Sequence, residues 1–181
     1  MLQTFIAIAA IAAAIVLWII STRRRLMVLD ENSGNAMSQI GVQLSSRFDA
    51  LTALLDLTIG YAGFESETLI GTIKSRRSVI TERSTPDDVM RQERVIAEAL
   101  SRIAIVTEQY PDLNANQNYI KTMGAVQTFE NMVRTSRLIY NDSVTKLNRE
   151  IRMFPVSMVA GLLGFGRREH LVEQTDVSHM T

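Results

Sequence analysis

The chain has 181 residues, the length of one domain or of a small domain with appendages. Its 19 basic and 19 acidic side chains give a formal net charge of zero. This balance argues against a nucleic acid as partner, because phosphate binding needs a basic excess or a basic stripe. There is no cysteine, so disulfides, thiolate metal sites and cysteine nucleophiles are excluded.

The first predicted element is an apolar helix. Residues 2–20 carry no charge, and at about 1.5 Å per residue such a helix spans the roughly 30 Å hydrocarbon core of a bilayer. A cleaved signal peptide is the competing interpretation, but it would need a basic residue before the apolar stretch. We therefore predict a transmembrane anchor over residues 1–22, whose apolar residues include Leu2, Ile6, Ile11, Ile15, Trp18 and Ile20.

A basic collar, residues 23–29, follows the predicted anchor and opens with Arg23, Arg24 and Arg25. Arginines stay on the cytoplasmic side of a spanning helix. The sequence therefore predicts a single-pass protein of the inner (cytoplasmic) membrane, with its amino terminus outside and its carboxyl-terminal body in the cytoplasm. The lipid bilayer is the first expected partner.

The body, residues 30–154, has the pattern of long packed helices. Prolines divide it into predicted helices near 30–83, 86–109 and 115–154, and a break of the first at Gly60 to Gly63 is left open. Thr85 is expected to cap the second helix and Asn114 the third. Mostly apolar residues recur at three- and four-residue steps in all three and form predicted seams. The seams consist of Met37, Gly41, Leu44, Phe48, Leu51, Leu55, Thr58 and Ala62 in the first helix, of Val89, Ile96, Ala99, Ile103, Val106 and Tyr110 in the second, with Gln92 as its polar member, and of Tyr119, Met123, Val126, Val133, Tyr140, Val144, Leu147, Ile151 and Phe154 in the third.

These seams predict the fold class, because such spacing is typical of helix-on-helix packing. We expect an all-α protein in which a single N-terminal transmembrane helix is followed by an antiparallel bundle of three to four long helices. Glu130 and Arg137 occupy seam positions despite their charge. Either the seam drifts and both are solvated, or they belong to a partly buried polar network that also involves Arg47 or Glu65.

The last predicted region, residues 155–181, combines an apolar segment with a polar tail. Its apolar part ends at Gly166 and is too short to span a bilayer. It is expected to pack on the bundle, to form an oligomer contact, or to lie in the membrane interface with Arg167 and Arg168 at the headgroups. The candidate interaction residues are Phe154, Pro155, Leu162 and Phe165.

Catalytic chemistry has little support in the sequence. The only histidines, His170 and His179, lie in the polar tail, and the chain has no HExxH spacing, phosphate-binding glycine loop, GxGxxG or EF-hand pattern. We predict no catalytic residue, no metal site and no cofactor. The protein is not expected to be an enzyme.

The stretch from Tyr110 to Tyr119, YPDLNANQNY, resembles the signature of the LemA family, with Tyr110, Pro111, Asn114, Asn116 and Gln117 as its motif residues. It serves either partner recognition at a helix connection or simply as a structural turn. Further matches cover most of the body, at residues 43–49 and 60–65, Glu130, Asn131, Arg134, Arg137, Tyr140, Asn141, Asn148, Phe154, Pro155 and residues 160–165.

Two departures suggest a divergent member of that family. The chain lacks the usual proline and asparagine after Asp49, and Phe64 precedes Glu65 where the family often has histidine. The resemblance implies a cytoplasm-facing antiparallel bundle on one membrane anchor, in a family without an established enzymatic activity.

Together these patterns favour a non-enzymatic scaffold or self-assembling module, with a homo-oligomer or another protein as partner and no nucleic acid. A signalling module acting through its long helices and a ligand-binding bundle are the alternatives.

Overall fold

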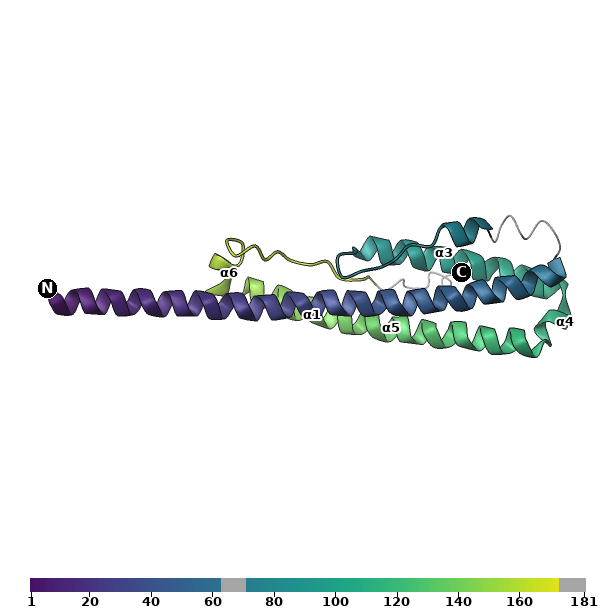
Figure 1. Ribbon diagram of the computed structural model, residues 1–181, viewed down its shortest axis with the longest axis horizontal. Helices are drawn as coiled ribbons and strands as arrows, with labels where there is room; N and C mark the ends of the chain where they lie inside the picture. The colour runs from purple at the N-terminus through teal and green to yellow at the C-terminus, as the bar shows by residue number, and fades with distance from the viewer. Residues whose placement is uncertain (63–70, 173–181) are drawn as a thin grey trace, which may run out of the picture. The chain divides into compact units, whose positions relative to one another are not determined.

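The computed structural model describes residues 1–62 and 71–172, except for the side chains of Tyr61 and Ala62. These residues form helices and connections without any strand, so the predicted all-α class is confirmed. The helices are α1 (Leu2–Ala62), α3 (Pro86–Gln109), α4 (Pro111–Asn114), α5 (Gln117–Arg152) and α6 (Val156–Val159), and residues 71–75 add a short helical segment (Figure 1).

The chain divides into two compact units, which are described separately. A central unit comprises residues 35–139, and a terminal unit comprises residues 1–34 with residues 140–181. Both α1 and α5 contribute residues to each unit.

Helix α1 continues without interruption from the predicted anchor through the arginine collar to Ala62. Residues 21–33 contain no proline or glycine that would stop a helix, and one glycine at Gly34 costs only about 1 kcal/mol relative to alanine. The predicted end of this helix near residue 83 is wrong, because residues 76–85 are not helical. The described helix ends at Ala62, which lies within the range Gly60 to Gly63 where a break was left open, and Gly63 itself lies outside the described residues.

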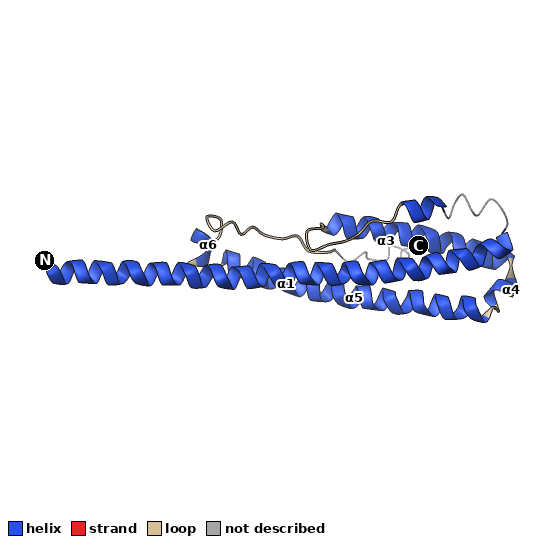
Figure 2. Cartoon of the chain, in the orientation of Figure 1, coloured by secondary structure: helices blue, strands red, loops and turns tan. Residues whose placement is uncertain are grey.

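In the central unit, residues 76–85 form a strap that returns along the helices (Figure 2). As the chain proceeds along the strap, its contacts with α1 move toward the start of α1, and its contacts with α3 move toward the start of α3. Since the strap is antiparallel to both helices, α1 and α3 run in the same direction. The contacts join Lys74 to Asp56, Arg77 to Asp49 and Ile80 to Gly41, and they join Arg76 to Glu98 and Ser78 to Gln92.

Helix α5 runs antiparallel to both. Thr107 near the end of α3 hydrogen-bonds Tyr119 near the start of α5, whereas Glu93 near the start of α3 pairs with Arg137 further along α5. The expected antiparallel packing therefore holds for α5 against α1 and α3 but not for α1 and α3, which the strap connects in the same direction.

The predicted seams form the core of the central unit. Most of their members are buried, and α5 contributes Tyr119, Val126 and Val133. The seam members that are not buried are the half-buried Val106, Met123 and Ile151 and the exposed Tyr110 and Phe154. The polar seam member Gln92 is also buried, and its Oε1 accepts hydrogen bonds from the Ser78 backbone N–H and hydroxyl, each at 2.8 Å. A glutamine on α3 thus fixes the strap.

The helix starts follow from capping chemistry. Thr85 Oγ1 accepts from the Asp88 N–H at 3.3 Å and Asp88 accepts from the Thr85 N–H at 2.9 Å, so the predicted cap of α3 is confirmed as a capping box. The Thr85 backbone N–H and hydroxyl both donate to the Asp88 carboxylate, and these two bonds lower the pKa of that carboxyl. The predicted cap at Asn114 is wrong, because Asn114 ends α4 and Asn116 Oδ1 instead accepts from the Asn118 N–H at 2.9 Å.

The terminal unit has a small core of its own. Leu26 of α1, Leu147 of α5, Val156 of α6 and Ala160 form a buried cluster. Leu29, Ile151 and Phe165 pack against it. This cluster joins α6 to α1 and α5, and its α1 members lie just beyond the three arginines of the collar.

Candidate functional site

The apolar part of α1 is exposed along its whole length. Residues 1–18 are all exposed, and an 18-residue window of this helix has a mean hydropathy of 2.6 with none of it buried. By length and composition α1 can cross a membrane, a criterion that signal sequences also meet. Thr22 and Leu26, directly beyond the apolar run, are nevertheless buried in the terminal unit, so the helix is part of the fold where the run ends.

The arginine collar is partly structural. Arg25 pairs with Glu150 of α5 at 3.0 Å, and the Glu150 side chain is largely buried. Arg23 and Arg24 are exposed. All three predicted topology residues are therefore exposed, and Arg25 also joins α1 to α5.

Two asparagines of α5 hold the carboxyl-terminal segment by its backbone. Asn148 donates to the Arg168 carbonyl at 2.8 Å and accepts from the Arg168 N–H at 3.0 Å. Asn141 donates to the Leu171 carbonyl at 2.9 Å and accepts from the Leu171 N–H at 2.8 Å. Each amide thus satisfies both backbone groups of one residue. We call this pair the asparagine clamp.

Three further contacts hold the same segment. The Tyr140 hydroxyl donates to the Glu169 carbonyl at 2.9 Å, Thr145 Oγ1 lies 3.0 Å from a His170 ring nitrogen, and Arg168 pairs with Asp30 of α1 at 2.7 Å. His170 is exposed, as expected for a tail residue, while His179 lies outside the described residues.

Burial raises the pKa of the Tyr140 phenol, the Arg168 charge opposes this shift and the Glu169 charge adds to it. The fold thus favours the neutral phenol. A raised folded pKa means that the stabilisation is complete below the ordinary tyrosine value of about 10 and is lost as pH rises through the folded pKa.

We expect the free energy of unfolding to fall on alkaline titration above about pH 10, and Tyr140→Phe to flatten part of that fall. Tyr119, whose pKa burial also raises, accounts for another part. Urea denaturation at a series of alkaline pH values measures both slopes. An unchanged slope in Y140F would show that the phenol does not contribute.

A second polar cluster lies in the central unit. Arg47 donates to Glu130 at 2.8 Å, and Arg137 donates two hydrogen bonds to Glu93 at 3.0 and 3.1 Å. Arg47 and Glu130 thus form one ion pair, and Arg137 forms another with Glu93, a partner that the sequence did not indicate. Glu65 lies outside the described residues.

The cost of burying Arg47 explains the arrangement. Burial lowers the pKa of the Arg47 guanidinium, and the charges of Glu130 and Glu93 oppose that shift. Among the described residues, Arg47 Nε has no hydrogen-bond partner. One buried cation thus depends on carboxylates from α5 and α3.

We expect a double-mutant cycle on Arg137 and Glu93 to give a coupling of about 1 kcal/mol, since both side chains are mostly buried. The matched control is the exposed pair Lys146 and Asp142, which is four residues apart on α5 and should couple by about 0.3–0.5 kcal/mol. Urea denaturation of both sets of variants measures the two couplings. Equal values would contradict a special role for the buried pair.

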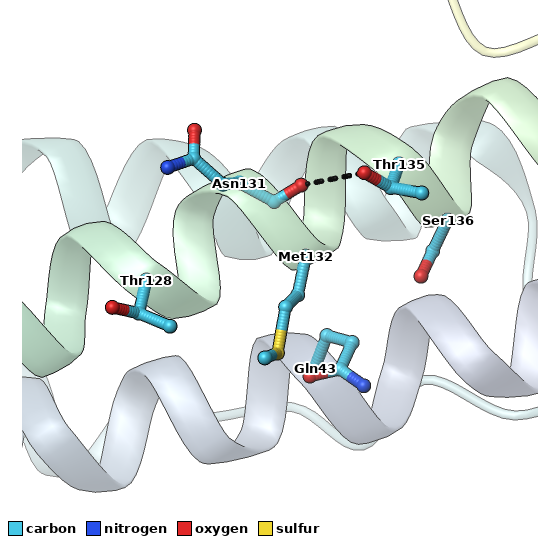
Figure 3. Close-up of a pocket in the computed structure, with 6 residues that line it drawn as sticks. All are labelled: Gln43, Thr128, Asn131, Met132, Thr135 and Ser136. Atoms are coloured by element: carbon cyan, nitrogen blue, oxygen red, sulfur yellow. Dashed lines mark hydrogen bonds between the residues drawn. The ribbon is translucent and has the colours of Figure 1, made fainter.

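A shallow groove runs between α1 and α5 of the central unit (Figure 3). It has a volume of about 440 Å³ and is lined by Gln43, Thr128, Asn131, Met132, Thr135 and Ser136. The lining carries hydroxyl, amide and thioether groups and no charge. It offers binding surface without an acid, a base or a nucleophile pair.

A sequence model of the LemA family matches residues 36–179. The chain belongs to the LemA family. Protein LemA of Metamycoplasma hominis is 31% identical over 142 residues, covering 76% of this chain and 64% of that protein. Magnetosome proteins MamQ 1 and MamQ 2 of Paramagnetospirillum magneticum are each 33% identical over 76 residues, covering 42% of this chain and 28% of theirs. The chain thus aligns with less than two thirds of the length of these relatives.

The LemA motif residues build the connection between α3 and α5. Pro111 begins α4, Asn114 ends it, Asn116 caps α5 and Gln117 is the first residue of that helix. Tyr110 is partly exposed. These positions favour the interpretation of the motif as a structural turn.

In this LemA-family chain, Asn141 and Asn148 match the family's sequence pattern, but the sequence alone gives them no structural role. A signal for the clamp was present in the sequence, because asparagine is a poor helix former and these two lie seven residues apart on one helix face. Their partner could not be read, since the clamp binds backbone atoms and any residue supplies those.

The candidate interaction segment divides into two sets. Phe154 and Leu162 are 79% and 88% exposed, and Pro155 is exposed beside them. Phe165 instead packs against the core cluster of the terminal unit. Within residues 1–60 and 71–172, no group of three or more histidine, aspartate or glutamate residues could hold a metal ion.

Proposed function

We propose that this LemA-family protein is a membrane-anchored, non-enzymatic scaffold at the inner face of the cytoplasmic membrane, and that it assembles with further copies of itself through its helical body. The exposed apolar helix supports anchoring, and the exposed Arg23 and Arg24 beyond it support a cytoplasmic body.

One observation carries the assembly proposal, an uncharged exposed stripe on α5 in the central unit. Thr128, Met132, Thr135 and Ile139 follow steps of four, three and four residues along α5, and the first three of them line the groove. All four are exposed, Met132 by 44% and Ile139 by 46%. This heptad spacing is that of a seam between two helices.

Anchoring favours a second copy as the occupant of the stripe. Copies anchored in one membrane in the same orientation share the direction of α5 about the membrane normal. Two such stripes meet in parallel, so each residue faces its counterpart across a two-fold axis.

The absence of native cysteine allows a direct test. We expect Met132→Cys, in the full chain in isolated membranes, to form a disulfide-linked dimer under mild oxidation. Ser101→Cys on α3, which is also exposed, is the matched control and should stay monomeric. Failure of Met132→Cys and of Ile139→Cys to cross-link would overturn self-assembly through this stripe.

A further inference from the structure

We propose that residues 153–165 form a second membrane contact, in which the exposed side chains of α6 and its flanking turns lie in the interfacial layer of the bilayer. This inference rests on the membrane anchoring proposed above.

The segment has one buried side and one exposed side. Val156 and Ala160 point into the terminal unit's core, where they pack with Leu26 and Leu147. Phe154, Met158 and Leu162, spaced four residues apart, are 79%, 68% and 88% exposed. Backbone hydrogen bonds from Met158 to Pro155, from Ala160 to Val156 and from Leu163 to Val159 keep this region helical enough to separate the faces.

The charge pattern fits a membrane interface. Residues 153–166 contain no charged side chain. Arg152 precedes them, Arg167 follows them, and both are exposed. Apolar side chains bracketed by arginines are typical of interfacial segments, in which the apolar face enters the boundary between headgroups and acyl chains while the cations meet lipid phosphates.

The contact with Leu26 sets the depth of residues 153–165 relative to the bilayer. Leu26 lies four residues beyond Thr22, the last uncharged residue before the collar, which is about 6 Å along the helix axis. If residues 2–22 span the hydrocarbon, Leu26 lies at headgroup level. Interfacial segments bury their apolar side by about 5–10 Å, so the exposed side chains beside Leu26 reach the acyl boundary.

A bilayer explains the exposed set better than a second copy does. The three side chains belong to the same compact unit as the exposed apolar residues of α1, which need the same lipid. A self-association surface would have no reason to lie level with the collar.

The single tryptophan makes this testable in the full-length protein, reconstituted in phosphatidylcholine–phosphatidylglycerol vesicles with or without brominated acyl chains. In the parent, bromine should quench Trp18, which lies in the proposed span. In the double variant Trp18→Phe, Phe154→Trp we expect bromine to quench the tryptophan emission strongly. The emission maximum should also lie at a shorter wavelength than that of tryptophan exposed to aqueous buffer. Trp18→Phe, Leu162→Trp is a second reporter that guards against a local folding defect.

The matched control is Trp18→Phe, Asn32→Trp. Asn32 is exposed on the same helix, about 15 Å beyond Thr22, so bromine should leave its emission unchanged. Quenching at Trp18 with none in the F154W and L162W reporters would overturn the interfacial contact and leave the anchor intact. Reporter emission that is insensitive to bromine but shifts when the protein is diluted with lipid would show that a second copy covers the exposed side chains. Absence of quenching at Trp18 in the parent would overturn the anchoring itself.

Discussion

Gly41→Ala should destabilise the protein by about 2 kcal/mol, although alanine is the better helix former. A Cβ at this position of α1 would lie 2.1 Å from the Ile80 carbonyl oxygen and 2.9 Å from its carbonyl carbon. Both atoms are backbone, so no side chain can rotate away. Either α1 or the strap must move, and the strap's contacts with α1 and α3 weaken with it.

The measurement is urea denaturation of the full chain, read as a lower midpoint with an unchanged slope, together with hydrogen exchange of residues 76–85. The matched control is Gly124→Ala in α5, where a Cβ meets no heavy atom within 4 Å. That change should be neutral or stabilise by up to about 1 kcal/mol. Similar midpoints for the two variants would contradict close packing at Gly41.

The strap also marks where sequence reasoning reached its limit. Period-3.6 patterning predicted the seams because each buried residue there is apolar and regularly spaced. The strap has one buried apolar residue, Ile80, among exposed polar ones, and it is held by side chains of other elements such as Gln92 and Asp49. A pattern within one segment cannot report partners that are distant in sequence, so a helix to residue 83 was predicted instead.

The same limit explains which members of the charged cluster in the central unit could be predicted and which could not. Charges at seam positions pointed to Glu130 and Arg137, because a charge in an apolar stripe is anomalous in itself, whereas Arg47 was named only as an alternative further member beside Glu65. Glu93 was missed, since it borders its seam, next to Gln92. The apolar helix at the start of α1 was the easiest element to predict, because a continuous apolar run is recognised from its composition alone and needs no tertiary partner.

Loss of the asparagine clamp should release the carboxyl-terminal segment while the helices stay folded. Asn141→Ala and Asn148→Ala each remove two hydrogen bonds to backbone groups, which at about 1 kcal/mol per bond gives about 2 kcal/mol for each variant. The double variant should approach about 4 kcal/mol if the two sites act independently. Among the described residues 166–172 only Leu171 is buried, so these hydrogen bonds are a large share of what holds the segment.

The readout is local, because the segment opens without the bundle. We expect the amide hydrogens of Arg168 and Leu171 to exchange roughly 30-fold faster in each single variant, the factor that corresponds to about 2 kcal/mol. Asn131→Ala, exposed on the same helix, is the control for helix propensity and should leave these amides unchanged.

Asn141→Asp separates the two bonds of one amide. The carboxylate keeps an acceptor for the Leu171 N–H but has no hydrogen to donate to the Leu171 carbonyl, so its effect should be intermediate between wild type and Asn141→Ala. Exchange as slow as in the wild type would mean that the donated bond contributes nothing. Exchange unchanged even in the double alanine variant would show that Tyr140 and the Arg168–Asp30 ion pair hold the segment without the clamp.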